Sequence, residues 1–223
     1  MNRSLLLTFL IGLAPALATA TPPTRAEVLR VAETFVNYQW LPTGRNVLHG
    51  PDSAGIVVQT PDRSTGDPDL WQPGQASVGV PYKWGGFDSL ASFERGVEAG
   101  KAAGDLYNQE KRRLGGKAVS ASAVGLDCSG FISRCWGLKE KQSTSSLAGL
   151  CVKLRSLAEL RPGDVLNFAG GHVVLFVKWL DASQTRFRCY EAAPYSRVRA
   201  SERNAPEMLA QGFKPLRFRQ IRE

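Results

Sequence analysis

The sequence predicts an α+β fold, and three observations carry this prediction. The helical patterns fall in the first two thirds of the 223-residue chain, separated by irregular stretches, the strand patterns fall in the last third, and no internal repeat alternates the two. Helices followed by a run of antiparallel strands are typical of the α+β class. The apolar content of 43% permits a buried core, and the length suits one sizeable domain or two small ones.

The first twenty residues have the features of a secretory signal peptide. Arg3 gives a positively charged start, Leu5 to Leu13 form a short apolar run, and Ala18-Thr19-Ala20 is a small-residue cleavage motif. We therefore expect export to the periplasm or the cell wall, with residues 1–20 removed. No other apolar run approaches the roughly 20 residues of a membrane span, so no integral membrane segment is expected after signal removal.

The charge of the chain favours a polyanionic environment. The formal net charge is +8, and removal of the signal with Arg3 leaves 8 − 1 = +7. A basic exported protein is attracted to polyanions such as bacterial cell walls. Nucleic acid is a weaker candidate, because the basic residues are scattered, their densest run is Lys111-Arg112-Arg113, and no nucleic-acid-binding motif accompanies them. We expect a monomer without a nucleic-acid partner.

Four cysteines, Cys128, Cys135, Cys151 and Cys189, limit the redox and metal chemistry. If Cys128 stays free as a nucleophile, at most one disulfide can form among the others. Cys135 would lie on the same helix as Cys128, roughly 10 Å away and too far for a bond. Buried thiols are therefore expected at the other three positions. No CxxC pair is present and the chain has two His, so neither a metal site nor a cofactor is expected.

After the signal peptide, a helix and an irregular arm in residues 21–78 precede the expected catalytic part, which spans residues 79–223. The helix is expected over 25–38, where apolar side chains share one face. Residues 41–80 are rich in Pro, Gly, Asp and Ser and predict an irregular arm. His49 falls in this arm, where a structural or solvated His is the usual case.

The middle of the chain alternates turns with helical patterns. A turn-rich aromatic segment over 79–86 leads into a helix expected over 89–103, and the small, basic and Gly-containing stretch 104–125 predicts a surface excursion. A helix follows from Cys128 to about Trp136. A further helix is expected over 146–157, where the preceding Ser and Thr residues can cap it.

The last third predicts antiparallel strands. Arg161-Pro162-Gly163-Asp164 suits a type II turn, because Pro fixes the second position and Gly accepts positive φ at the third. Strands are expected over 165–168, 172–179, 185–193 and 213–220, where β-branched and aromatic residues concentrate.

Asp127-Cys128-Ser129-Gly130 has the pattern of a nucleophile at a helix N-terminus. A thiol attacks effectively only as the thiolate, and the N–H groups and dipole of a helix N-terminus stabilise that form. Asp127 is a natural cap for the helix that follows. The same N–H groups are positioned to stabilise an oxyanion during acyl transfer. Taken alone, Cys128 would more often be a buried, inert thiol.

His172 is the candidate base, and strand pairing offers it a partner. It opens a strand after Gly170-Gly171, at the edge of the expected sheet. With an even-length loop in the next hairpin, His172 and Glu191 share one face: a loop at 181–182 sets them opposite each other and one at 182–183 sets them on the diagonal. An odd-length loop would turn Glu191 away. A strand-end His and a solvent-facing Glu are the alternative interpretations.

Three segments in order resemble the NlpC-type cell-wall cysteine peptidases of the papain-like superfamily. They are Val80-Pro81-Tyr82-Lys83-Trp84-Gly85-Gly86, Asp127-Cys128-Ser129-Gly130-Phe131, and Leu160-Arg161-Pro162-Gly163-Asp164 followed by Gly171-His172-Val173. The resemblance covers roughly residues 79–193. The long stretch 87–126 departs from the family pattern and could form a lid or a groove wall.

The resemblance implies a fold of helices packed on an antiparallel sheet and a role for each matching residue. Cys128 would be the nucleophile and His172 the base. The third polar residue lies on the next strand, where His, Asn or Gln is usual and Glu191 stands here. Tyr82 would lie beside the thiolate and assist the oxyanion. Asp127 and Ser129 would line the substrate end.

The function expected from these observations is hydrolysis of an amide bond in peptidoglycan stem peptides, for example a γ-D-glutamyl bond to a diamino acid. The same dyad would also serve an N-acetylmuramoyl-L-alanine amidase or an acyltransferase. A non-catalytic cell-wall-binding module is the alternative from another functional class.

Overall fold

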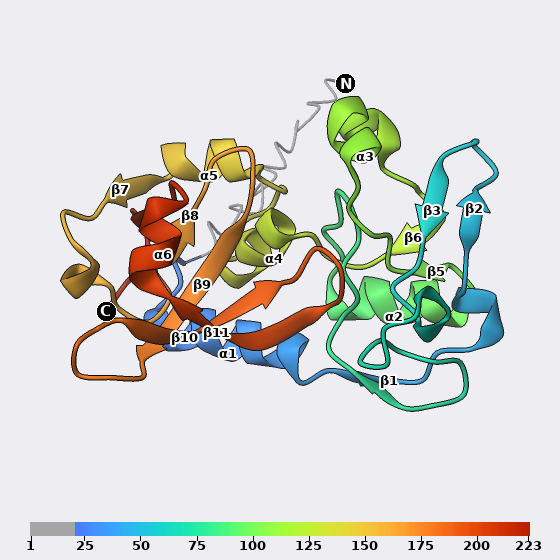
Figure 1. The fold of residues 1–223 in the computed structure, drawn as a ribbon, viewed down its shortest axis with the longest axis horizontal. Helices are drawn as coiled ribbons and strands as arrows, with labels where there is room; N and C mark the ends of the chain where they lie inside the picture. The colour runs from blue at the N-terminus through green and yellow to red at the C-terminus, as the bar shows by residue number, and fades with distance from the viewer. Residues whose placement is uncertain (1–20) are drawn as a thin grey trace, which may run out of the picture.

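A six-stranded antiparallel sheet organises the C-terminal half of the computed structural model, which describes residues 21–223 (Figure 1). The expected signal peptide, residues 1–20, lies outside the described residues. The strand order is β11-β10-β9-β8-β12-β7. The bounds are β7 Cys151–Lys153, β8 Val165–Asn167, β9 Val173–Trp179, β10 Arg186–Ala192, β11 Val198–Asn204 and β12 Lys214–Phe218.

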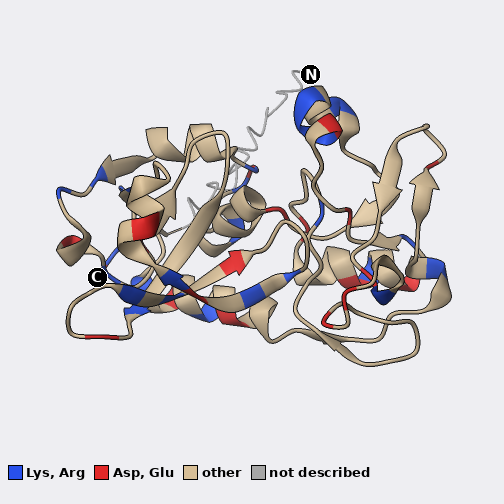
Figure 2. Cartoon of the chain, viewed as in Figure 1, with Lys and Arg blue, Asp and Glu red and all other residues tan. Residues whose placement is uncertain are grey.

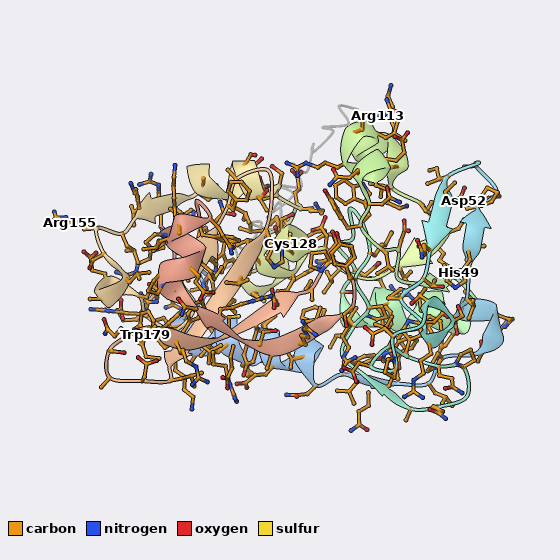
Figure 3. The ribbon with its side chains drawn as sticks, viewed as in Figure 1. His49, Asp52, Arg113, Cys128, Arg155 and Trp179 are labelled. Atoms are coloured by element: carbon orange, nitrogen blue, oxygen red, sulfur yellow. The ribbon has the colours of Figure 1, made fainter. Side chains whose placement is uncertain are left out.

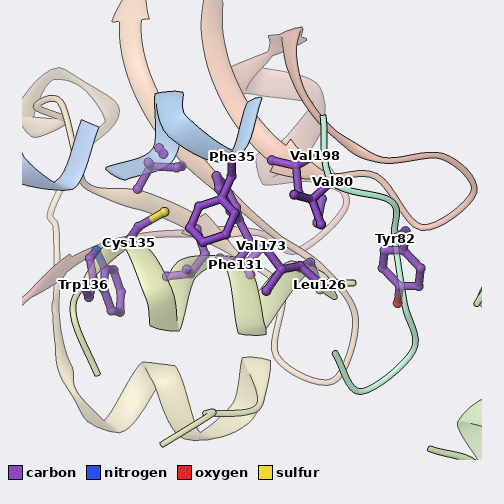
Figure 4. Close-up of a cluster of buried hydrophobic side chains, with 14 of the residues drawn as sticks. Phe35, Val80, Tyr82, Leu126, Phe131, Cys135, Trp136, Val173 and Val198 are labelled. Carbon is purple, nitrogen blue, oxygen red and sulfur yellow. The ribbon is translucent and has the colours of Figure 1, made fainter. Parts of the chain in front are cut away.

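Both faces of this sheet are covered. On one face lie α1 (Arg25–Val36) and α4 (Cys128–Cys135), and their apolar side chains share a core with Val173 (Figure 4). The other face packs against α6 (Ala205–Ala210), where Val174 is buried. Strand positions that are buried on both faces require a continuous apolar run. This requirement explains why Val173 to Phe176 are all buried and all apolar.

A second lobe is built from residues 39–124, a nearly continuous stretch of the chain (Figure 1). It contains three two-stranded pairs and two helices: β1 (Gln39–Trp40) with β4 (Ser77–Val78), β2 (His49–Pro51) with β3 (Val57–Gln59), β5 (Ala102–Ala103) with β6 (Ala123–Val124), α2 (Leu90–Glu98) and α3 (Gln109–Leu114). The buried Lys111 side chain ties α3 to the β2–β3 pair. The Lys111 ammonium lies 2.7 Å from Asp105 and also donates to the Val57 carbonyl.

The stretch 104–125 differs from the surface excursion that the sequence predicts. It contains α3, a 3-10 helix over Gly115–Ala118 and β6, and Asp105, Lys111 and Val124 are buried. The amphipathic pattern is too short to reveal this burial, since β6 has two residues and pairs in parallel with β5. The stretch is a folded part of the second lobe.

Two expected helices are shorter than predicted. The helix expected over 146–157 is α5, Thr144–Gly149, and the residues after it form β7 because they pair with β12. The helix expected over 89–103 ends at Glu98 in α2, and Gly100 follows with a φ of 79°. The short strands β1 to β7, helices α3 and α6, and strand β11 were not predicted, and β2 and β3 lie in the stretch 41–80 that was expected to be irregular. Helices α1 and α4, strands β8, β9, β10 and β12, and the turn at Gly163 with its φ of 90° match predicted elements, and the mixture of helices and strands agrees with an α+β fold.

Charge is distributed over both lobes rather than gathered on one face in the view of Figure 2.

Among residues 21–223, every helix is too short or too polar to cross a bilayer.

Candidate active site

Cys128 is the first residue of α4, and Asp127 caps the helix. The Asp127 carboxylate accepts hydrogen bonds from the Gly130 N–H at 2.6 Å and from the Ser129 hydroxyl at 3.0 Å. Its other oxygen lies 2.9 Å from the Lys141 ammonium. The N–H groups of Cys128 and Ser129 belong to the same first turn, where a helix supplies no carbonyl partner. These groups therefore remain available to an anion at the thiol.

Glycine at position 130 is required by a close backbone approach. A Cβ atom added there would lie 2.0 Å from the carbonyl oxygen of Gly86. The Asp127 N–H donates to the same carbonyl at 3.2 Å. The start of α4 therefore rests directly on the segment that carries Tyr82, and this contact sets the position of the nucleophile relative to that segment.

His172 lies immediately before β9 and contacts two other predicted site residues. Its Nε2 lies 2.8 Å from a carboxylate oxygen of Glu191. Its Nδ1 is buried and has no hydrogen bond of good geometry within residues 21–223, although the imidazole is close enough to the Cys128 thiol for that group to affect its pKa. Burial alone would lower the pKa of His172, but hydrogen bonding and charge interactions with Cys128 and Glu191 outweigh it and raise that pKa to about 9.

Glu191 is fully buried beneath His172 and is held as a carboxylate. Its second oxygen pairs with the Arg203 guanidinium at 2.5 Å. Burial alone would raise the pKa of Glu191, yet the hydrogen bond to His172 and the charges of His172 and Arg203 lower it to about 2. Glu191 is therefore ionised at any physiological pH and keeps the His172 imidazole oriented.

Arg203 is a site residue that the sequence reasoning missed. It lies on β11, an edge strand that was not predicted, and its side chain reaches Glu191 along the face of the sheet. The alternation of Arg199, Ser201 and Arg203 on one face is the signal that could have indicated it. A buried carboxylate requires a counter-charge, and a basic residue on the strand beside Glu191 meets this requirement.

The loop between β9 and β10 is of odd length, the alternative that would turn Glu191 away, yet Glu191 still shares a face with His172. Near the turn, Phe187 pairs with Trp179 and Arg188 with Lys178, which gives an odd-length loop. The register then shifts, and Cys189 pairs with Phe176. This β-bulge at Val177 inserts one residue and restores the parity. Glu191 consequently returns to the face of His172, in the diagonal position.

Tyr82 lies beside the nucleophile. It is buried, and it lines the same cavity as Cys128, Asp127 and Ser129. Burial and the neighbouring Cys128 and Asp127 raise the pKa of its phenol well above the usual range. Tyr82 therefore keeps its proton and can donate a hydrogen bond to an oxyanion. The structure thus gathers all six predicted site residues at one end of α4.

A cavity of about 640 Å³ opens at the Cys128 end of α4, which Figure 3 places near the centre of the molecule. One wall comes from the α4–α5 connection with Lys141 and from the Gly170-Gly171 turn. The rest of the lining comes from Trp84, from Tyr195 in the β10–β11 turn, and from Tyr107 and Arg112 in the stretch 87–126. The stretch 87–126 is therefore a cavity wall.

The other candidate groups lie apart from this chemistry. Like Cys128, the other three cysteines are free and buried. Burial raises the pKa of Cys151 to about 12 and also raises those of Cys135 and Cys189, which keeps these thiols protonated and inert. His49 bonds to Asp62 in the second lobe. Within residues 21–223, no three His, Cys, Asp or Glu side chains gather as a metal site.

Comparison with known proteins adds no relative to this picture. No protein-family model matches the sequence, and no curated protein matches it, so the functional argument rests on the site itself.

Proposed function

We propose that this chain is an exported cysteine hydrolase with an NlpC-type, papain-like fold that cleaves an amide bond in peptidoglycan stem peptides, such as a γ-D-glutamyl bond to a diamino acid. The observation that supports it most is the connected series Cys128, His172 and Glu191. The thiol interacts with an imidazole whose other nitrogen is held by a buried carboxylate, and the thiol opens on a cavity. This is the arrangement of an activated nucleophile, a base and an orienting group.

The first half of the reaction forms an acyl enzyme. His172 takes the thiol proton, and the Cys128 sulfur attacks the substrate carbonyl carbon. The oxyanion that develops is stabilised by the N–H groups of the first turn of α4 and by the Tyr82 hydroxyl. Collapse of the tetrahedral intermediate breaks the C–N bond, and His172 gives its proton to the leaving amine.

The second half releases the product. A water molecule enters the site of the departed amine and loses a proton to His172 as it attacks the thioester. The intermediate collapses, the C–S bond breaks, and the thiolate and imidazolium form again. Glu191 stays ionised throughout, since its pKa of about 2 is far below neutrality.

The substrate assignment draws on three further features. The first twenty residues have the composition of a secretory signal, and the rest of the chain carries a net charge of +7 (8 − 1). The three motifs that contain Tyr82, Cys128 and His172 occur in the order of the cell-wall peptidases that they resemble. A polyanionic wall attracts a basic enzyme.

The test is incubation with defined muropeptides and mass spectrometry of the products. Cleavage between the D-glutamyl and diamino-acid residues, lost in Cys128→Ala and in His172→Ala, is the expected result. His49→Ala is the matched control, because the other His of the chain lies in the second lobe and should leave turnover intact. Release of the whole stem peptide from muramic acid would replace the proposal with the amidase, and acyl transfer without hydrolysis would replace it with the transferase.

A binding module without catalysis is separated by thiol chemistry. An activated thiolate at Cys128 should be alkylated by iodoacetamide at pH 6 much faster than a small free thiol. Labelling at the rate of a free thiol, together with retained binding to sacculi, would contradict the proposed hydrolase.

A further inference from the structure

Positive side chains outnumber negative ones in the lining of the cavity. The charged residues there are Arg112, Lys141 and Asp127. The Asp127 carboxylate is already engaged by the N–H of Gly130, the Ser129 hydroxyl and the Lys141 ammonium. Arg112 is exposed and makes no ion pair within residues 21–223. Among residues 21–223, the cavity lining therefore holds one cation without an ion pair, Arg112, and no carboxylate without one.

The position of Arg112 is built into the fold. On the preceding residue of α3, the buried Lys111 is fixed by Asp105 and by the Val57 carbonyl. The end of α3 is fixed by Trp84, whose indole N–H donates to the Gly115 carbonyl at 3.1 Å. Successive helix positions differ by about 100° in direction. With Lys111 turned into the lobe, Arg112 is directed to the cavity.

The next residue provides a natural comparison. Arg113 pairs with Glu110 on the surface of α3 and does not line the cavity. Figure 3 shows Arg113 projecting away from the body of the molecule. Arg112 and Arg113 thus carry the same charge on adjacent positions but face different surroundings.

We propose that the cavity selects substrates with a free carboxylate, which Arg112 binds on the wall formed by residues 87–126. A guanidinium matches a carboxylate through two parallel hydrogen bonds, and the absence of an uncompensated acid in the lining disfavours a free ammonium group there. This inference rests on the proposed function, because it takes Cys128 as the reacting thiol. Within stem peptides, the group recognised is a carboxylate that neighbours the scissile amide.

The first experiment needs no turnover. Iodoacetate and iodoacetamide both alkylate a thiolate: a C–S bond forms and iodide leaves. Iodoacetate transfers a carboxymethyl group with a negative charge, and iodoacetamide transfers the neutral carbamoylmethyl group. The ratio of their rate constants at Cys128, normalised to 2-mercaptoethanol, reports the preference of the cavity for an anion. Arg112→Gln should lower this ratio roughly two- to fivefold at low ionic strength, as expected for one screened charge.

The controls make this result specific. Arg113→Gln should leave the ratio unchanged, and Arg112→Lys should restore most of it. Thermal unfolding of each variant verifies that it is folded. An equal ratio in the wild type, Arg112→Gln and Arg113→Gln would overturn the inference.

The second experiment uses two γ-glutamyl peptides that differ in the α-carboxylate against its carboxamide. The wild type should favour the carboxylate in kcat/KM, and Arg112→Gln should lose that preference. Equal hydrolysis of both peptides by the wild type would overturn the inference even if alkylation responded to Arg112. If the wild type hydrolyses neither peptide, the proposed function fails, and the alkylation ratio still decides whether the cavity favours carboxylates.

Discussion

Replacing Glu191 with Gln should change how the stability of the protein depends on pH. The pKa of Glu191 is lowered from 4.5 to about 2, and this difference corresponds to about 3 kcal/mol. Because the folded-state pKa is depressed, this stabilisation is complete above about pH 5 and is lost as the pH falls toward 2. Between pH 5 and pH 3, the wild type should lose about 2 kcal/mol through this one carboxylate, whereas Glu191→Gln has nothing to titrate there.

Urea unfolding followed by Trp fluorescence at pH 5 and at pH 3 measures the effect. At pH 5 the variant should be about 3 kcal/mol less stable than the wild type, because Arg203 and His172 lose their shared buried anion. At pH 3 the difference in unfolding free energy between the wild type and the variant should be smaller by about 2 kcal/mol. We expect His172 to be protonated in the folded and the unfolded protein at both pH values, and the other carboxylates contribute equally to the wild type and the variant. Glu202→Gln removes a carboxylate whose pKa is also lowered, by Arg186 and Arg188, but these ion pairs are exposed and screened by solvent, so it should change the pH profile far less than Glu191→Gln does. A gap for Glu191→Gln that is equal at the two pH values would refute the reasoning.

Three further changes test the site. His172→Ala should lower kcat/KM for a muropeptide by about 10²- to 10⁴-fold, as expected for loss of a general base, while His49→Ala should not change it. Asp127→Ala should lower the free energy of unfolding by about 1–2 kcal/mol through loss of the helix cap, measured by urea unfolding at pH 7. Gly130→Ala should lower it by about 1–3 kcal/mol, because the added Cβ meets the Gly86 carbonyl at 2.0 Å; an unchanged midpoint would mean that the backbone can yield there.

Local sequence patterns predicted the elements that carry the chemistry. The start of α4 could be placed at Cys128 because Asp127 caps the helix and an apolar stretch follows. The start of β9 was predicted within one residue because a buried strand needs a continuous apolar run. Both signals lie within a few residues of the element that they define.

Elements that depend on distant partners were not predictable in the same way. The apolar pattern of α5 continues through Cys151, yet pairing with β12 makes that residue the first of β7. Strand β11 carries several charged residues and exists as a strand because it pairs along β10. Arg203 was missed for this reason, although it completes the charge balance of Glu191. Tertiary pairing outweighs local propensity in each case.

The bulge at Val177 divides the β9–β10 hairpin into two parts that can vary separately. On the site side, β8 pairs with β9 from Val173 to Leu175, so β9 is held there between two strands, whereas beyond the bulge β9 pairs with β10. On the far side, the turn around Ala182 and Ser183 is exposed and carries no site residue. An affinity tag or a fluorescent reporter inserted at that turn should therefore leave the distance between His172 and Glu191 unchanged, which makes the hairpin tip a suitable attachment point for locating the protein in cells.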